Sequence, residues 1–201
     1  MLVFIRHGET DSNVPGQERL RGKLPIPLNH DGVKGAEEVA DAISELKDVK
    51  EVRTGTYVRV VQTSHEVGKA LGMELTPMEE YNDWDTGDFA GELTSKVLKD
   101  IHDRIQHPLK PVKNGESFQE WLDKIVPALH EVVESDEIYV VVSSGRVATL
   151  LEALSKNKGD HPDTDTLLGK PPIDPGGILI VGADWKIRFK TAKVEESKGM
   201  S

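Results

Sequence analysis

Two short apolar runs constrain the fold of this chain more than any other feature. Leu2 to Ile5 and Ile138 to Val142 are continuous apolar stretches, which are typical of strands covered on both faces of a parallel sheet. Apolar residues at helical spacing follow each run, after a loop in the first case and directly in the second. Alternating strands and helices predict an α/β fold, here a three-layer α/β/α sandwich with a mostly parallel central sheet.

The other elements follow from apolar spacing and from turn residues. A first helix is predicted over Val33 to Leu46, with Asp31 as its cap, and a second from about Tyr57 to Leu71, with Val60, Val61, Val67 and Ala70 facing inward. A third helix is predicted over Val97 to Ile105. A fourth is predicted from Ser117 to Val132, with a kink or a break at Pro127. Further strands are predicted at Val49 to Arg53, Ile178 to Val181 and Ile187 to Thr191, and loops at Gly87 to Gly91 and Lys156 to Pro175.

Length and composition restrict the class of protein. We expect the 201 residues to form one domain over 1–194 with a disordered tail over 195–201. The net charge of -10 disfavours nucleic acid and anionic lipid as partners but leaves a small anionic ligand open. The absence of cysteine excludes disulfides, a thiol nucleophile and cysteine metal sites. No apolar stretch approaches the roughly 20 residues that span a bilayer, and the start lacks a secretory apolar region, so we expect a cytoplasmic protein.

The first apolar run ends in the string Arg6-His7-Gly8-Glu9-Thr10. Ligands of open α/β sheets bind beyond the carboxyl ends of the strands, which is where this string would lie. A histidine beside a fixed cation at that edge favours a site that handles anions. An ordinary polar turn is the alternative, and residues further along the chain must decide between the two.

Several strings follow Arg6-His7 in a recognisable order. They are Asn13, Arg21-Gly22, Arg59-Val60-Val61-Gln62-Thr63, Gly87 with Gly91, and Gly115-Glu116-Ser117. In this order they resemble the histidine phosphatase superfamily, which includes cofactor-dependent phosphoglycerate mutases and many small phosphatases. The resemblance covers residue 1 to about residue 155 and implies a phosphoglycerate mutase-like fold of the small phosphatase branch. Its specific part is the combination of Arg6-His7 with the Arg59 string.

The resemblance implies a hydrolase that acts on a small phosphorylated substrate. His7 would be the nucleophile of a metal-independent phosphomonoester phosphatase with a phosphohistidine intermediate, and no cofactor is expected. Arg6 and Arg59 would clamp the phosphoryl group, since guanidinium groups match its oxygens and neutral imidazole is nucleophilic near pH 7. Asn13 would add a neutral donor. Arg21, beside Gly22, would reach a second anionic group, although a solvated loop arginine is an equally open reading.

The proton donor is the first departure from the family pattern. The family usually has a glutamate four residues before the glycine matched by Gly87, and this chain has Asp83 there. Asp85 and Glu80 are nearby rivals, because an aspartate is one methylene shorter than a glutamate and geometry decides such roles before pKa does. Asp83 is narrowly preferred.

The second departure follows the strand Ile138 to Val142. The family normally presents a second histidine in a Ser-His-Gly string, whereas this chain reads Ser143-Ser144-Gly145. Ser144 offers only a hydroxyl, and the helix that begins near Gly145 can offer backbone N–H groups to an anion. Losing a donor aimed at transition-state charge typically costs on the order of 10²- to 10³-fold in turnover. Arg146 is placed either to substitute in part or to face solvent.

Two other functions compete with that of a phosphatase. A catalytically weakened relative that binds a phosphorylated ligand or a protein partner is the alternative, and Ser144 is its motivation. A phosphoglycerate mutase is disfavoured, because the chain is compact between Gly91 and Gly115. No metal site is expected, since His102 and His107 are five residues apart, which is wrong for one helical face.

Overall fold

The computed structural model describes residues 1–191, and the predicted tail over 195–201 lies outside them. Six strands form one sheet in the order β3-β2-β4-β1-β5-β6. They are β1 (Leu2–Arg6), β2 (Val49–Thr54), β3 (Leu75–Pro77), β4 (Ile138–Ser143), β5 (Ile178–Val181) and β6 (Ile187–Lys190). The first four in this order, β3, β2, β4 and β1, are parallel, and β5 and β6 pair antiparallel at the other edge. The predicted, mostly parallel sheet is therefore confirmed.

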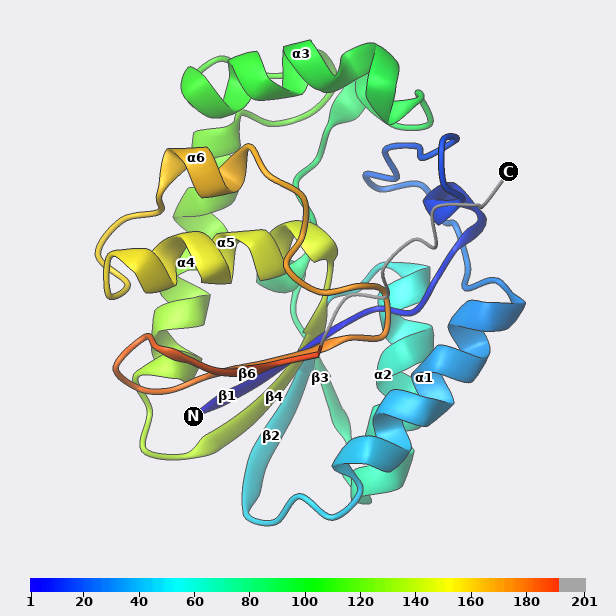
Figure 1. Cartoon of the computed structure of the whole chain (residues 1–201), viewed down its shortest axis with the longest axis vertical. Helices are drawn as coiled ribbons and strands as arrows, with labels where there is room; N and C mark the ends of the chain where they lie inside the picture. The colour runs from blue at the N-terminus through cyan, green and yellow to red at the C-terminus, as the bar shows by residue number, and fades with distance from the viewer. Residues whose placement is uncertain (192–201) are drawn as a thin grey trace, which may run out of the picture.

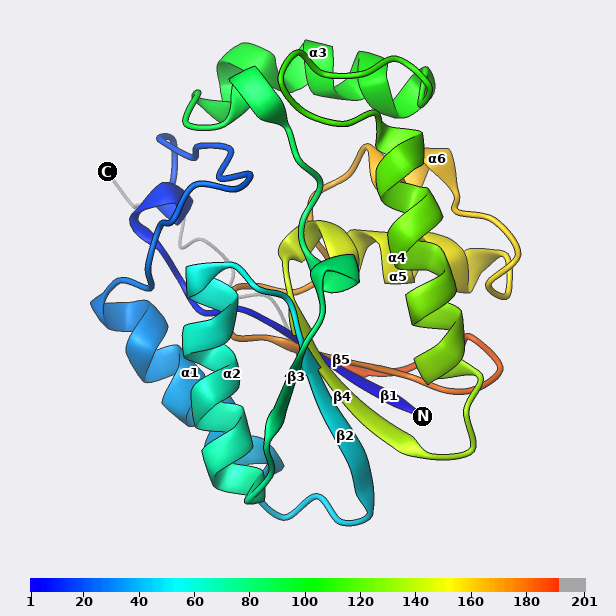
Figure 2. The same ribbon diagram turned by 180° about the vertical axis from the view of Figure 1, so that it is seen from behind.

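Helices cover both faces of the sheet (Figures 1 and 2). The helices are α1 (His30–Ile43), α2 (Val58–Leu71), α3 (Thr94–Gln106), α4 (Phe118–Val133), α5 (Gly145–Lys156) and α6 (Thr164–Leu167), with short 3-10 turns η1 (Asp11–Asn13), η2 (Glu79–Tyr81) and η3 (Gly87–Phe89). Helices α1 and α2 lie on one side, while α4, α5 and α6 lie on the other, with α3 at the end of the molecule (Figure 1). In residues 1–191 no helix combines the length and apolarity needed to cross a membrane.

The continuous apolar strands contribute side chains to two separate hydrophobic cores. Leu2 and Phe4 of β1 join the core that contains α3, α4 and α5. Val3 and Ile5 point to the opposite face and join the core that contains α1 and α2. Successive side chains of a strand alternate between faces, so a strand buried on both sides must be apolar at every position. This requirement explains the two apolar runs and fixes β1 and β4 in the centre of the sheet.

Several predicted helix details are wrong. Asn29 caps α1 by accepting a hydrogen bond from Gly32 N at 2.8 Å, whereas Asp31 lies in the first turn. Pro127 does not break α4, which runs through it from Phe118 to Val133, and the alternative of a kink remains a prediction. Val61, predicted to face inward, is 39% exposed. Helical spacing predicts a face but not its width, and the apolar face of α2 is narrower than the pattern implied.

The segment between α5 and β5 differs from the predicted surface loop. It contains α6 and carries Leu167 and Ile173 into the core. Strand β3 was not predicted, because its three residues are too few to show a periodic pattern. The predicted loop at Gly87 to Gly91 contains the turn η3. The Ser117 start of α4 is confirmed, with a capping box in which Ser117 and Glu120 bond each other's backbone N–H groups.

Candidate active site

The carboxyl ends of β1 and β4 bring the two predicted site strings together. Arg6 pairs with Ser143 in the parallel register, and His7 N donates to Ser143 O at 2.9 Å. His7 and Ser144 therefore leave neighbouring strands at the same edge of the sheet. This edge is where ligands bind in open parallel sheets.

His7 is fully buried and is held in one tautomer. Its Nδ1 lies 2.7 Å from Gly8 O. A carbonyl oxygen only accepts, so Nδ1 must carry the proton and Nε2 of the neutral ring keeps its lone pair. Nε2 is buried and has no hydrogen-bond partner among residues 1–191. The ring therefore presents an unused nucleophilic nitrogen at the sheet edge.

The surroundings of His7 keep the imidazole neutral. Burial lowers the pKa of His7 well below its usual value of 6.5, and the charges of Arg21, Arg59 and Arg6 lower it further. The hydrogen bond to Gly8 acts in the opposite direction but is the smaller effect. A neutral ring among guanidinium groups can attack an anion that those groups attract.

One nitrogen of the Arg6 guanidinium is anchored, and another has no hydrogen-bond partner in residues 1–191. Its Nη1 donates to Ile173 O at 2.8 Å, while its buried Nε has no partner within the described part of the chain. Burial lowers the pKa of Arg6 to about 10, so the group remains charged at neutral pH. The guanidinium lies directly against Gly145, where an added Cβ would come within 2.9 Å of Arg6 Cζ. Glycine at this position is a requirement of the close approach.

Arg59, at the start of α2, is also buried and directed by carbonyl groups. Its Nη2 donates to Gly22 O at 3.1 Å, and its guanidinium lies 5.1 Å from the centre of the Tyr57 ring. Gly22 has a φ of +45°, a left-handed conformation that favours glycine. The Arg59 Nε is buried and without a partner in residues 1–191. The loop that carries Gly22 therefore orients the second predicted clamp.

Arg21 is largely buried close to His7 and does not lie on the solvated loop surface. Among the neighbouring charges, its effect on the pKa of His7 is the largest. Burial lowers the pKa of Arg21 to about 10, and its Nε is buried without a partner in the described chain. The nearby Arg19 instead donates to Gly91 O at 2.7 Å in an exposed contact. The burial of Arg21 contradicts the alternative of a solvated loop arginine, while the predicted contact of Arg21 with an anionic group of the substrate remains a prediction.

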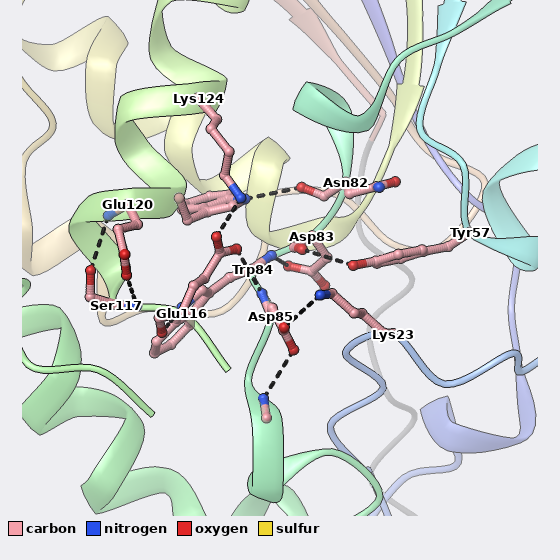
Figure 3. Close-up of polar contacts among 12 residues, drawn as sticks. Lys23, Tyr57, Asn82, Asp83, Trp84, Asp85, Glu116, Ser117, Glu120 and Lys124 are labelled. Carbon is pink, nitrogen blue, oxygen red and sulfur yellow. Dashed lines mark hydrogen bonds and ion pairs between the residues drawn. The ribbon is translucent and has the colours of Figure 1, made fainter. Parts of the chain in front are cut away.

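Asp83 is a carboxylate close to the arginines, and the charge of Asp174 also acts on Arg6. Its charge raises the pKa values of Arg6, Arg21, Arg59 and Arg146 alike. Asp85 instead forms an ion pair with Lys23 at 2.7 Å, and Figure 3 shows these two side chains pointing toward each other. Glu80 is exposed in η2. Of the three predicted rivals, only Asp83 has a charge that acts on all four arginines, and its role as proton donor remains a prediction.

The segment that carries Asp83 is fixed against residues 113–117. Trp84 Nε1 donates to Glu116 O at 3.1 Å, and Asp85 N donates to Glu116 Oε1 at 3.1 Å (Figure 3). Gly87, with a φ of +44°, packs so closely that an added Cβ would lie 2.2 Å from Lys113 O. The Gly87 and Gly115-Glu116-Ser117 strings therefore hold the acidic segment in place.

Ser144 has a structural role, and its predicted contact with a phosphoryl group remains a prediction. It is 1% exposed and caps α5 by accepting a hydrogen bond from Val147 N at 3.4 Å. Asn13 has a similar local role, because its Oδ1 accepts from Thr10 N at 3.0 Å and so shapes the turn after His7. The donor role predicted for Asn13 remains a prediction.

Two polar side chains near the site were not predicted from the sequence. Thr63 Oγ1 accepts a hydrogen bond from Gly8 N at 3.0 Å and ties the His7 turn to α2. The sequence signal for Thr63 was its position at the end of the string Arg59-Val60-Val61-Gln62-Thr63. Thr86 Oγ1 is buried without a partner in the described chain, and no sequence signal pointed to it. Residues 1–191 hold no group of three or more His, Cys, Asp or Glu side chains arranged to bind a metal ion.

The comparison with known proteins agrees with this geometry. The model of the histidine phosphatase superfamily (branch 1) matches residues 2–164. The chain belongs to this superfamily. It is 26% identical to the uncharacterized phosphatase PhoE of Bacillus subtilis over 158 residues, which is 77% of each protein.

Solved structures share the fold of this histidine phosphatase. A mycobacterial glucosyl-3-phosphoglycerate phosphatase superposes with a TM-score of 0.72 and 20% identity, over 93% of this chain and 96% of the other. The alpha-ribazole phosphatase from Shigella flexneri gives a TM-score of 0.69 and 21% identity, over 96% and 94%. At these identities the likeness concerns the fold, which is the predicted phosphoglycerate mutase-like architecture.

Proposed function

We propose that this histidine phosphatase hydrolyses phosphomonoesters through a phosphohistidine formed on His7. The observation that carries the proposal is the buried Nε2 of His7, which has no hydrogen-bond partner in the described chain and lies within the electrostatic reach of three arginines. The membership of the superfamily and the relatives named phosphatases support the same reaction. The substrate is a small phosphorylated molecule.

The first step transfers the phosphoryl group to His7. Arg6, Arg21 and Arg59 bind the phosphoryl oxygens and stabilise the charge that spreads over them in the transition state. Nε2 attacks phosphorus, and the bond from phosphorus to the ester oxygen breaks. The leaving oxygen takes a proton from the neutral carboxyl group of Asp83.

The second step regenerates the enzyme. A water molecule attacks the phosphorus of the phosphohistidine and gives a proton to the Asp83 carboxylate. The bond from phosphorus to Nε2 breaks, and the electron pair returns to the ring. Every group in the cycle belongs to this chain, so we propose that no metal ion is needed.

The proposal is tested by phosphate release from a generic aryl phosphomonoester, with and without a chelator. We expect turnover that the chelator leaves unchanged and that His7→Ala abolishes. His65→Ala is the matched control, because it removes another histidine of the chain from the exposed side of α2. Turnover that survives in the His7→Ala protein, or that the chelator removes, would contradict the proposal.

Ser144 favours a second candidate function. A protein with a serine at this strand exit can bind a phosphorylated ligand through the arginines and turn it over poorly. Calorimetric titration with inorganic phosphate separates the two functions when combined with the turnover assay. Phosphate binding without turnover at high enzyme concentration would favour the binding protein.

A further inference from the structure

Arg146 is a fourth arginine near the site, and the two catalytic steps leave it without a role. It is the second residue of α5, and its Nε lies 3.7 Å from Asp83 Oδ1. Its guanidinium lies over the Trp84 ring, 5.4 Å from the ring centre. Attraction to the ring face holds the planar group in a defined orientation.

The position of Arg146 relates to the leaving group rather than to the phosphoryl group. The largest charge effects on His7 come from Arg21, Arg59 and Arg6. Arg146 instead pairs with Asp83, which must stand beside the leaving oxygen if it is to protonate it. The side chains of Arg146 and Asp83 are 21% and 16% exposed, so both are reachable from solvent.

Charge balance shows what Arg146 lacks during the reaction. Asp83 can give a proton only in its neutral form, and in that form it no longer balances the charge of Arg146. A partly buried cation without a counter-charge is unfavourable. An anionic group on the alcohol part of the substrate would restore the balance at the moment when Asp83 is ready to donate.

We propose that Arg146 is a specificity-determining residue that selects phosphomonoesters whose alcohol part carries a carboxylate or another anionic group close to the ester oxygen. The proposal rests on the proposed function, since it assumes that a phosphoryl group binds beside His7. It names the substrate class by charge and by the short distance between the two anionic groups. Arg21 and Arg59 are left to the phosphoryl group.

The experiment compares two esters that differ in one charge, the phosphate ester of glycolic acid and that of glycolamide. We expect the wild-type protein to prefer the acid in kcat/KM by roughly 10- to 100-fold, the range for hydrogen bonds to charged groups. Arg146→Met should reduce this preference at least tenfold, and Arg146→Lys should restore part of it. Arg188→Met is the matched control, because Arg188 pairs with Asp184 at an exposed position.

A binding measurement separates the selectivity from the turnover. Calorimetric titration of the His7→Ala protein with both esters gives their affinities without reaction, and adding Arg146→Met should remove the preference for the acid. Turnover with equal kcat/KM for both esters would overturn the inference and leave the proposed function intact. A preference in binding that depends on Arg146, without turnover in the wild-type protein, would overturn the function and support the subsite. Circular dichroism of each variant shows whether the protein is folded, so that a loss of folding is not mistaken for a lost preference. Equal affinities of the folded His7→Ala protein for the two esters would refute the inference.

Discussion

Replacing Ser144 with histidine should raise turnover while lowering stability. The histidine would place an imidazole N–H on the phosphoryl group at the end of β4, beside the end of β1 that carries His7. Adding a donor aimed at transition-state charge should increase kcat by about 10²- to 10³-fold. The donor acts on charge that develops only in the transition state, so the affinity for inorganic phosphate should change less than kcat.

The cost in stability follows from the cap of α5. Ser144 Oγ accepts from Val147 N at 3.4 Å, which is long for a hydrogen bond. Losing an N-cap costs about 0.5–2 kcal/mol, and the long distance places this one near the lower end. For a protein of this size 1 kcal/mol corresponds to a change of about 2–4 °C in Tm.

Two further variants separate the effects in the same assay. Ser144→Ala should lose the cap without gaining rate, and Ser144→Asn should keep the cap without gaining the imidazole. Phosphate release gives kcat, and thermal unfolding followed by circular dichroism gives Tm. A folded Ser144→His protein with unchanged kcat would refute the reasoning, because it would show that this position does not face the phosphoryl group.

Three other predictions follow from the site. Gly145→Ala should lower kcat/KM by roughly 10²-fold, since its Cβ would lie 2.9 Å from Arg6 Cζ and move the clamp; an unchanged rate would show that Arg6 is not a clamp. Asp83→Asn should lower kcat by about 10²- to 10⁴-fold for esters with poor leaving groups, and Asp85→Asn much less, so equal losses would contradict the assignment of the proton donor. Because the pKa of folded His7 lies below 6.5, the neutral nucleophile persists below that pH, and kcat/KM should begin to fall only at a more acidic pH. As the pH falls below 6.5, His7 takes up a proton in the unfolded chain before it does so in the folded protein. This difference should lower the free energy of unfolding by up to about 1.4 kcal/mol for each pH unit of acidification, and the His7→Ala protein should lack this contribution.

The sequence predicted the centre of the fold and the core of the site because both depend on short-range patterns. The continuous apolar runs define β1 and β4, and the residues that follow these strands necessarily meet at one edge. The order of residues alone was therefore enough to place Arg6, His7 and Ser144 together.

The residues on loops could not be placed in the same way. Arg21 and Arg19 are two residues apart in one polar segment, and only the path of that loop decides which of them reaches His7. Asp83 and Asp85 were close rivals for the same reason, since the ion pair of Asp85 with Lys23 joins segments about 60 residues apart. Such contacts depend on tertiary geometry, which spacing along the chain does not record.

The most direct test of the account is the detection of phosphate on His7. The enzyme is mixed with excess phosphomonoester, quenched in base within milliseconds, and digested for mass spectrometry, with the acid lability of the phosphate measured in parallel. The account predicts acid-labile phosphate on the peptide that contains His7, formed and lost at rates that match turnover. Turnover without phosphate on His7 at any quench time, or with phosphate on another residue, would contradict the account.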